Sequence, residues 1–182
     1  MEQNVSMKIN ELPSPTWNWL KVNETPIKWS NKIEPCEIAA EGDAVSTETE
    51  QLSDIETGAG READAIFATE NTAKYQILAD NAGQDKTVRL HISGKKDAHT
   101  AGCVEIVAKE NSTLTVVMDS RVAPDATKEE ESTAEASLAV RVRMKVESGA
   151  SVRLIQVQMP QEHETLSVSY THLRAHETVL DL

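Results

Sequence analysis

The chain has 182 residues, of which 39% are hydrophobic, and this is enough to bury the core of a single domain. Its 30 acidic and 18 basic residues give a net charge of −12, which argues against binding to nucleic acid or to an anionic membrane, because both depend on clustered Lys and Arg. No apolar run approaches the roughly 20 residues that span a bilayer, and the first ten residues lack the plan of a signal peptide, so we expect a cytoplasmic protein without membrane partners.

Residues 1–33 form a segment that contains all three tryptophans of the chain. Pro13 and Pro15 favour an extended entry, and Thr16 can cap a short helix that carries Trp17 and Trp19. Tryptophan combines a large apolar area with one N–H donor, and it is common at interfaces. The segment is therefore expected to pack on its own domain or, alternatively, on a partner.

Residues 34–63 are predicted to be an acidic linker. Between Glu34 and Asp64 there are ten acidic residues and one basic residue, Arg61, with no aromatic residue and no sustained apolar period. Such a stretch cannot bury much surface, so a flexible or weakly helical linker is expected, with an acidic docking segment as the alternative.

Residues 64–167 have the sequence pattern of a β-sheet protein. Short β-branched runs of strand length are separated by turn residues such as Gly83, Asn111 and Gly149. A charged insertion at residues 124–135 is expected to be exposed. The five predicted strands are Val88–Ile92, Cys103–Ala108, Leu114–Met118, Leu138–Val146 and Val152–Met159.

The last two runs carry the most detailed predictions. An alternation of period two in Leu138–Val146 predicts one face in the core and one face in water. In Val152–Met159 the alternation slips at Leu154 and Ile155, which predicts a bulge or a corner. In the first of these runs the inward residues are Val140, Val142, Met144 and Val146, and the outward residues are Arg141, Arg143 and Lys145.

These runs predict an all-β fold, but periodicity alone leaves a sandwich, a barrel and a solenoid equally open.

Candidate cofactor and metal sites are weak in this sequence. Gly58–Ala63 matches the letters of the dinucleotide fingerprint, but an acidic stretch precedes it where a strand is required, so we interpret its glycines as a turn. Cys36 and Cys103 stand in unrelated contexts and form neither a disulfide framework nor a thiolate cluster for a metal.

The histidines do not form a convincing site either. His172 and His176 have the spacing of two metal ligands on one helix face, but a third ligand is missing, and His163 is the nearest candidate. His91 lies near a strand end and His99 in a polar loop, where a single histidine is usually structural or solvated. We therefore predict no catalytic, cofactor-binding or metal residues and no enzymatic activity.

Five segments of the chain occur in the order and approximate spacing of a known family, and TWNWLKVN and VRLIQVQ are the most specific of them. They are Pro15–Asn23, Gly58–Ala65, Val88–His91, Leu114–Asp119 and Val152–Gln158. Through these segments the chain resembles the SufB/SufD family, and its SufD branch in particular, over about residues 9–158.

This resemblance implies a right-handed parallel β-helix, of which the chain would hold the N-terminal coils, preceded by a short N-terminal segment and the acidic linker. It also implies a scaffold subunit of the SufBCD complex for iron–sulfur cluster assembly, with SufB and the ATPase SufC as partners. The cluster would be assembled by the full complex, and no cofactor would be bound by this chain alone.

The sequence departs from the family toward its end. The family's cluster-assembly residues and SufC-binding helices would lie beyond the matching region, so no functional residue is carried over. Residues 168–182 look like a non-native tail, with an adapter-like string from about Ser169, which predicts a C-terminally truncated fragment.

Two other functions stay open on sequence grounds. One is a stand-alone β-rich binding module, which is disfavoured because Phe67 and Tyr75 are the only aromatic residues between Asp64 and Val168. The other is a small enzyme using His91 or His163, which would need a pocket with a perturbed titratable group.

Overall fold

The computed structural model describes residues 4–9, 25–30, 32–49, 61–68, 70–80, 83–122 and 136–158. Most of them lie in β-strands that form parallel sheets, which confirms the prediction of an all-β protein. The helix in this part of the chain, α1 (Arg61–Phe67), has seven residues, and no described helix is long and apolar enough to cross a membrane.

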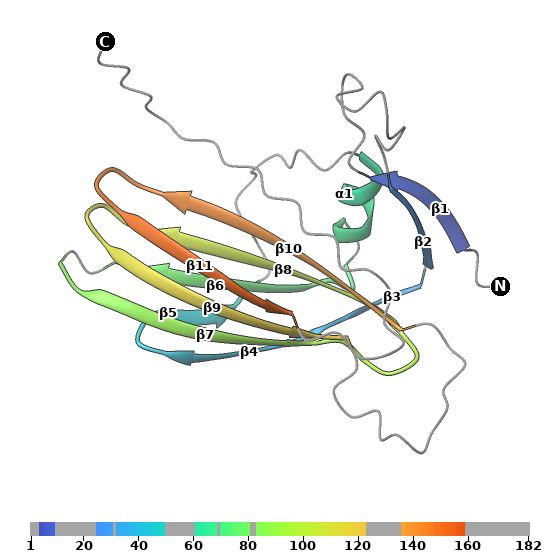
Figure 1. Cartoon of the computed structure of the whole chain (residues 1–182), viewed down its shortest axis with the longest axis horizontal. Helices are drawn as coiled ribbons and strands as arrows, with labels where there is room; N and C mark the ends of the chain where they lie inside the picture. The colour runs from blue at the N-terminus through green and yellow to red at the C-terminus, as the bar shows by residue number, and fades with distance from the viewer. Residues whose placement is uncertain are drawn as a thin grey trace, which may run out of the picture.

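Three successive strand pairs stack on one another in the body of the molecule (Figure 1). A strand pair here means two strands that follow each other along the chain and lie in different sheets. The first strand of each pair joins a sheet of order β10-β8-β6-β5, and the second joins a sheet of order β11-β9-β7-β4. Every pairing among β6 to β11 is parallel, as expected for residues 64–159. The pairs are β6 (Ala73–Ala79) with β7 (Asp85–Ser93), β8 (His99–Ala108) with β9 (Thr113–Arg121), and β10 (Ser137–Val146) with β11 (Ser151–Gln158).

The core lies between the two sheets. Alternate residues of each strand point into it, so the period of two in the sequence becomes one buried face per sheet. Its fully buried members come from both sheets and include Ile77, Val88, Leu90, Ile92, Val104, Ile106, Leu114 and Val116.

One corner of the stack repeats in all three pairs. Gly83, Asn111 and Gly149 occupy equivalent positions between the paired strands, and all three have positive φ angles, of 79°, 58° and 68°. The corners also hydrogen-bond to one another, from Gly83 N to the Asn111 carbonyl and from Asn111 N to the Ser148 carbonyl. These turn residues therefore adopt the left-handed backbone conformation, and the corners that they form stack on one another.

The prediction of an acidic linker is wrong for residues 34–48. This stretch contributes to β3 (Ile33–Pro35), β4 (Glu37–Gly42) and β5 (Val45–Glu48). β4 pairs antiparallel with β7, and β5 pairs antiparallel with β6, so the two strands close one end of both sheets. Backbone pairing and the packing of Ile38 and Ala40 on the core hold the stretch despite its charge, because Glu37, Glu41 and Asp43 are exposed to solvent.

Several other predictions concern residues outside the described ranges. These are the short helix with Trp17 and Trp19, the insertion at 124–135 and the tail at 168–182. The described parts of the N-terminal segment form an antiparallel pair, β1 (Asn4–Ile9) with β2 (Thr25–Ser30).

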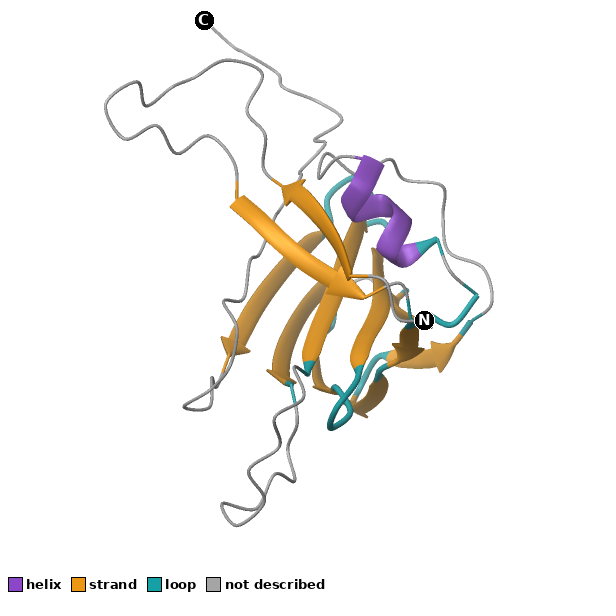
Figure 2. Cartoon of the chain, turned by 90° about the vertical axis from the view of Figure 1, so that its right-hand side faces the viewer, coloured by secondary structure: helices purple, strands orange, loops and turns teal. Residues whose placement is uncertain are grey.

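β10 agrees with its predicted alternation only in part. Val140, Val142 and Met144 pack against the core as expected, but Val146 is 48% exposed. The opposite face is not simply in water, because the Arg141 side chain is only 17% exposed. Helix α1 packs on this outer face through Ile66 and Phe67, which contact Ala101 and Ala139. Figure 2 shows the helix, in purple, beside the strands.

The bulge expected at Leu154 and Ile155 is absent. β11 pairs with β9 in one unbroken register from Ser151 to Gln158. The slip in the alternation instead places Ile155 and Val157 on the outer face of the sheet, where both stay exposed.

Candidate functional site

A row of polar side chains crosses the outer face of the β10-β8-β6-β5 sheet, and we call it the polar ladder. Its two rungs follow from the strand register, which aligns one residue each from β6, β8 and β10. The first rung is Lys74, Cys103 and Arg141, and the second is Gln76, Glu105 and Arg143.

Glu105 is the central acidic group of the polar ladder. Its side chain is fully buried, and its Oε2 accepts a hydrogen bond of 2.7 Å from Gln76 Nε2. A buried carboxylate is costly unless it is hydrogen-bonded or paired with a cation. The neighbours in the register, Gln76 on one side and Arg143 on the other, supply the types of partner that this burial requires.

Arg141 ties the polar ladder to helix α1. Its Nη1 lies 3.4 Å from Asp64 Oδ1, and its guanidinium carbon is 4.8 Å from the centre of the Phe67 ring. A planar guanidinium can make an ion pair at its edge and a cation–π contact with its face at the same time. Arg141 therefore positions α1 on the sheet.

The two cysteines are closer than their sequence contexts suggested. Cys36 N donates a hydrogen bond to the Ala101 carbonyl, and Cys36 Sγ lies where a side chain on Gly102 would stand. Cys103, the next residue, points to the opposite face of β8, toward Arg141. Both thiols are free and buried, and β8 separates them.

Burial keeps both thiols protonated at neutral pH. Desolvation raises the pKa of Cys36 to about 12. Desolvation also raises the pKa of Cys103, although the Arg141 guanidinium opposes this effect. Because the thiolate is the nucleophile and the metal ligand, burial disfavours the reactive form of both cysteines.

His91 lines a shallow hollow on the outer face of the other sheet, together with Ile92, Ser93, Asp119 and Arg121. Its Nδ1 lies 3.7 Å from Asp119 Oδ2, which is also 3.4 Å from Arg121 Nη2. An enzyme that used His91 would therefore have a carboxylate beside the imidazole. The three titratable groups of the hollow, His91, Asp119 and Arg121, contact one another through the Asp119 carboxylate, and this geometry by itself defines no reaction.

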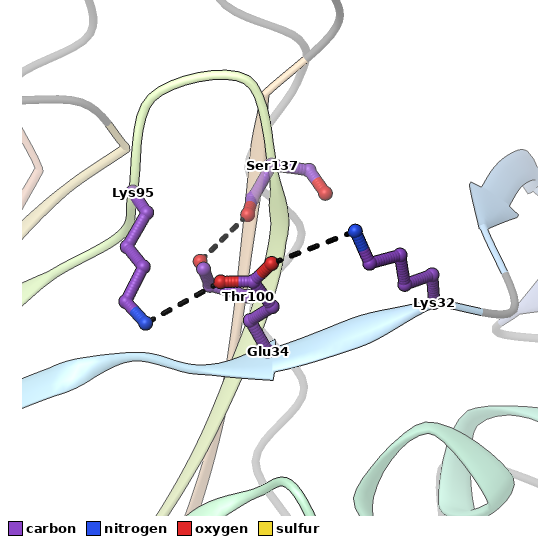
Figure 3. A network of polar contacts seen from close by, with 5 residues as sticks. All are labelled: Lys32, Glu34, Lys95, Thr100 and Ser137. Carbon is purple, nitrogen blue, oxygen red and sulfur yellow. Dashed lines mark hydrogen bonds and ion pairs between the residues drawn. The ribbon is translucent and has the colours of Figure 1, made fainter.

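His99 lies in β8 and not in a polar loop. Its Nδ1 is 2.6 Å from Ser137 Oγ, beside the hydrogen bond from Thr100 Oγ1 to the Ser137 carbonyl. Figure 3 shows the hydrogen bond between Thr100 and Ser137 together with the ion pairs of Glu34 with Lys32 and Lys95. These contacts join β3, the start of β8 and the start of β10, which gives His99 a structural setting.

The other candidates from the sequence lie outside the described residues. They are His163, His172, His176 and the glycines at 58 and 60, whereas Arg61, Glu62 and Ala63 of the Gly58–Ala63 motif form the start of α1. Within the described ranges, no three His, Cys, Asp or Glu side chains gather in a way that could hold a metal ion.

The polar ladder could not be found from the sequence, because it joins segments 29 and 38 residues apart through strand register alone. The alternation around Glu105 and Arg143 gave a signal for sheet faces but none for their pairing.

Comparisons of the chain with family models, with curated proteins and with solved structures find no match.

Proposed function

We propose that this protein is a SufD-like scaffold subunit in iron–sulfur cluster assembly, and that its three strand pairs are successive coils of a right-handed parallel β-helix. The observation that carries the proposal is that, among β6 to β11, each strand pairs in parallel with the second strand along the chain, in both sheets. A β-helix requires such connectivity, so the pairing supports the proposal. The motif segments at Val88–His91, Leu114–Asp119 and Val152–Gln158 fall on β7, β9 and β11.

A scaffold role agrees with the chemistry of the described residues. The polar ladder positions a helix, and both thiols are buried in their protonated form. We propose that the cluster is a cargo of the assembled complex, with ATP hydrolysis supplied by SufC and the chain acting through its surfaces.

The partner experiment is co-expression of the tagged chain with SufB, with SufC and with both, followed by affinity purification and quantification of each subunit. We expect SufB or the SufB–SufC pair to co-purify with the full chain in a fixed ratio. An untagged chain expressed with the same partners controls for adsorption to the resin. Absence of both subunits from the purified chain would overturn the assignment.

The chemical experiment is anaerobic incubation of the purified chain with ferrous iron and sulfide, followed by desalting and iron analysis. We expect no stoichiometric iron to remain, because a cluster needs thiolate ligands. A Cys36→Ser, Cys103→Ser double variant is the matched control and is expected to behave identically. Stoichiometric iron that disappears in the double variant would contradict the scaffold role.

A further inference from the structure

The sheet of order β11-β9-β7-β4 carries apolar side chains on its outer face, which is turned away from the core (Figure 1). We call Val117, Ile155 and Val157 the apolar strip. Val117 and Ile155 are register partners on β9 and β11, and Val157 follows Ile155 on the same face. Ile155 and Val157 are 43% and 39% exposed. Apolar side chains that are exposed next to one another, unlike scattered ones, indicate an interaction surface.

Two arginines flank the apolar strip. Arg153 lies two residues before Ile155 on β11, and Arg89 of β7 is the register partner of Val117 on β9. Both arginine side chains are exposed, and among the described residues neither forms an ion pair. The two guanidinium groups are therefore available to an acidic ligand.

The carboxylates of this face do not cancel that charge. Asp119 already pairs with His91 and Arg121, at 3.7 and 3.4 Å. Glu41 is the register partner of Arg89 on β4, and β4 is the strand farthest from β11 in this sheet. Although the whole chain carries a net charge of −12, salt screens its distant charges beyond a Debye length of about 8 Å. The local charge beside the apolar strip is positive.

The opposite sheet shows how this fold covers an outer face of the same kind. There α1 packs Ile66 and Phe67 on the strands, and Asp64 of the same helix lies 3.4 Å from the Arg141 guanidinium. An acidic helix with an apolar face thus covers a sheet that presents an arginine beside apolar residues. Helix α1 contacts β1 and β8, and within the described part of the chain no helix lies on the apolar strip.

The strand backbone favours a helical ligand over an extended one. β9 lies between β7 and β11, so its backbone groups are used inside the sheet. An extended peptide gains affinity from backbone hydrogen bonds at a sheet edge, which a sheet face does not offer. A helix satisfies its own backbone and presents side chains about 5–6 Å apart at positions i and i+4. This spacing is close to the roughly 4.8 Å between strands and about 6.6 Å between alternate residues of one strand.

We propose that the apolar strip is a docking surface for an acidic amphipathic helix of a partner protein. The apolar side of that helix covers Val117, Ile155 and Val157, and its carboxylates pair with Arg153 and Arg89. This proposal does not depend on a role in iron–sulfur cluster assembly.

The probe is a fluorescein-labelled synthetic peptide of about 18 residues, with leucines along one side of the helix and glutamates along both flanks. Fluorescence anisotropy measures its binding to the full chain. We expect a Kd of roughly 10–100 µM. A peptide of identical composition, with its leucines spread around the helix, is the matched control and should bind at least about tenfold more weakly.

Three variants of the chain test where the peptide binds. Ile155→Ala removes apolar contact area and should weaken binding about fivefold. Arg153→Glu replaces attraction by repulsion and should weaken binding by about the same factor. Lys145→Glu makes the same change of charge at an exposed position of β10, in the other sheet, and should alter the Kd by less than about twofold. Circular dichroism of each variant confirms that it folds.

Other results overturn the proposal. No binding up to about 1 mM, or equal binding of the two peptides, would show that the strip does not recognise an amphipathic helix. An effect of Ile155→Ala without an effect of Arg153→Glu would contradict an acidic partner. Binding to phosphatidylserine vesicles in place of the peptide, lost in both variants, would assign the face to a membrane. Self-association in place of peptide binding, abolished by Ile155→Ala, would assign it to a second copy.

Discussion

At the scale of single residues, the fold depends on side chains whose partners come from distant parts of the chain. Glu105 and Gln76 meet because β8 and β6 share one register, and Cys36 fills the space beside Gly102 because β3 aligns with the start of β8. Glu105 and Cys36 are both buried, so removing the Glu105 carboxylate or ionising the Cys36 thiol should lower the free energy of unfolding.

Glu105 gives the first prediction. Glu105→Leu should lower the free energy of unfolding by about 2 kcal/mol, because it leaves Gln76 and neighbouring cations without a buried acceptor. Glu105→Gln keeps an acceptor oxygen and should lose clearly less. Urea unfolding monitored by circular dichroism measures both. Equal losses for the two variants would show that side-chain volume matters here and hydrogen bonding does not.

The Cys36 thiol gives a dependence on pH. Its pKa rises from 9.0 to about 12 on folding because burial disfavours the thiolate. The unfolded chain therefore releases this proton first, so the stabilisation is complete below pH 9 and is lost as the pH rises from 9 toward 12, by up to roughly 1.4 kcal/mol per pH unit.

The measurement for this dependence is urea unfolding at pH 7 and pH 10 of the unmodified chain and of Cys36→Ala. The variant lacks only this thiol. The contributions of other groups that titrate in alkali are therefore the same in both chains and cancel when the two are compared. The stability of the unmodified chain should fall more than that of the variant. Parallel losses would show that the thiol ionises equally in both states.

Gly149 gives the third prediction. Its φ of 68° is unfavourable for any residue with a side chain, and a Cβ there would collide with Asn111 Oδ1. Gly149→Ala should therefore cost about 2 kcal/mol. Gly83→Ala is the matched control, because its φ is 79° but its Cβ would meet no atom within 4 Å. It should cost about 1 kcal/mol. A reversed order in thermal or urea unfolding would argue against stacking of these corners.

At the scale of elements, the sequence predicted what depends on local pattern. The five apolar runs became β7 to β11, because alternation and β-branched residues are local signals. β6 was missed because Lys74 and Gln76 interrupt a short run. β4 was missed because its charge outweighed the alternation of Ile38 and Ala40. The polar ladder and the approach of Cys36 to Gly102 were beyond prediction, since both require the register between segments.

Replacing isoleucine by alanine at two positions, one on β4 and one on β11, tests whether β4 closes the end of the sheet. Ile38 packs on the core and touches the space above Gly102, whereas Ile155 lies exposed on β11. Ile38→Ala should lower the free energy of unfolding by about 2 kcal/mol. Ile155→Ala should change it by less than about 0.5 kcal/mol. A negligible effect at Ile38 would restore the interpretation of this stretch as a solvated linker.

At the scale of the whole molecule, stability should vary along the stack. A stack in which each strand pair contacts only its neighbours gains stability from every interface, so central pairs are held on two sides and a terminal pair on one. The pair β8 and β9 has neighbours on both sides, whereas β10 and β11 have neighbours on one side among the described strands. The closing strands β4 and β5 protect the first end.

Amide hydrogen exchange followed by mass spectrometry tests this gradient. In dilute solution, peptides from β8 and β9 should exchange slowest, and peptides from β10 and β11 should exchange faster, because local opening of the terminal pair breaks one interface instead of two. Uniform protection of all these strands would mean that the stack opens as one cooperative unit, and the free energy would then not be distributed by strand pair.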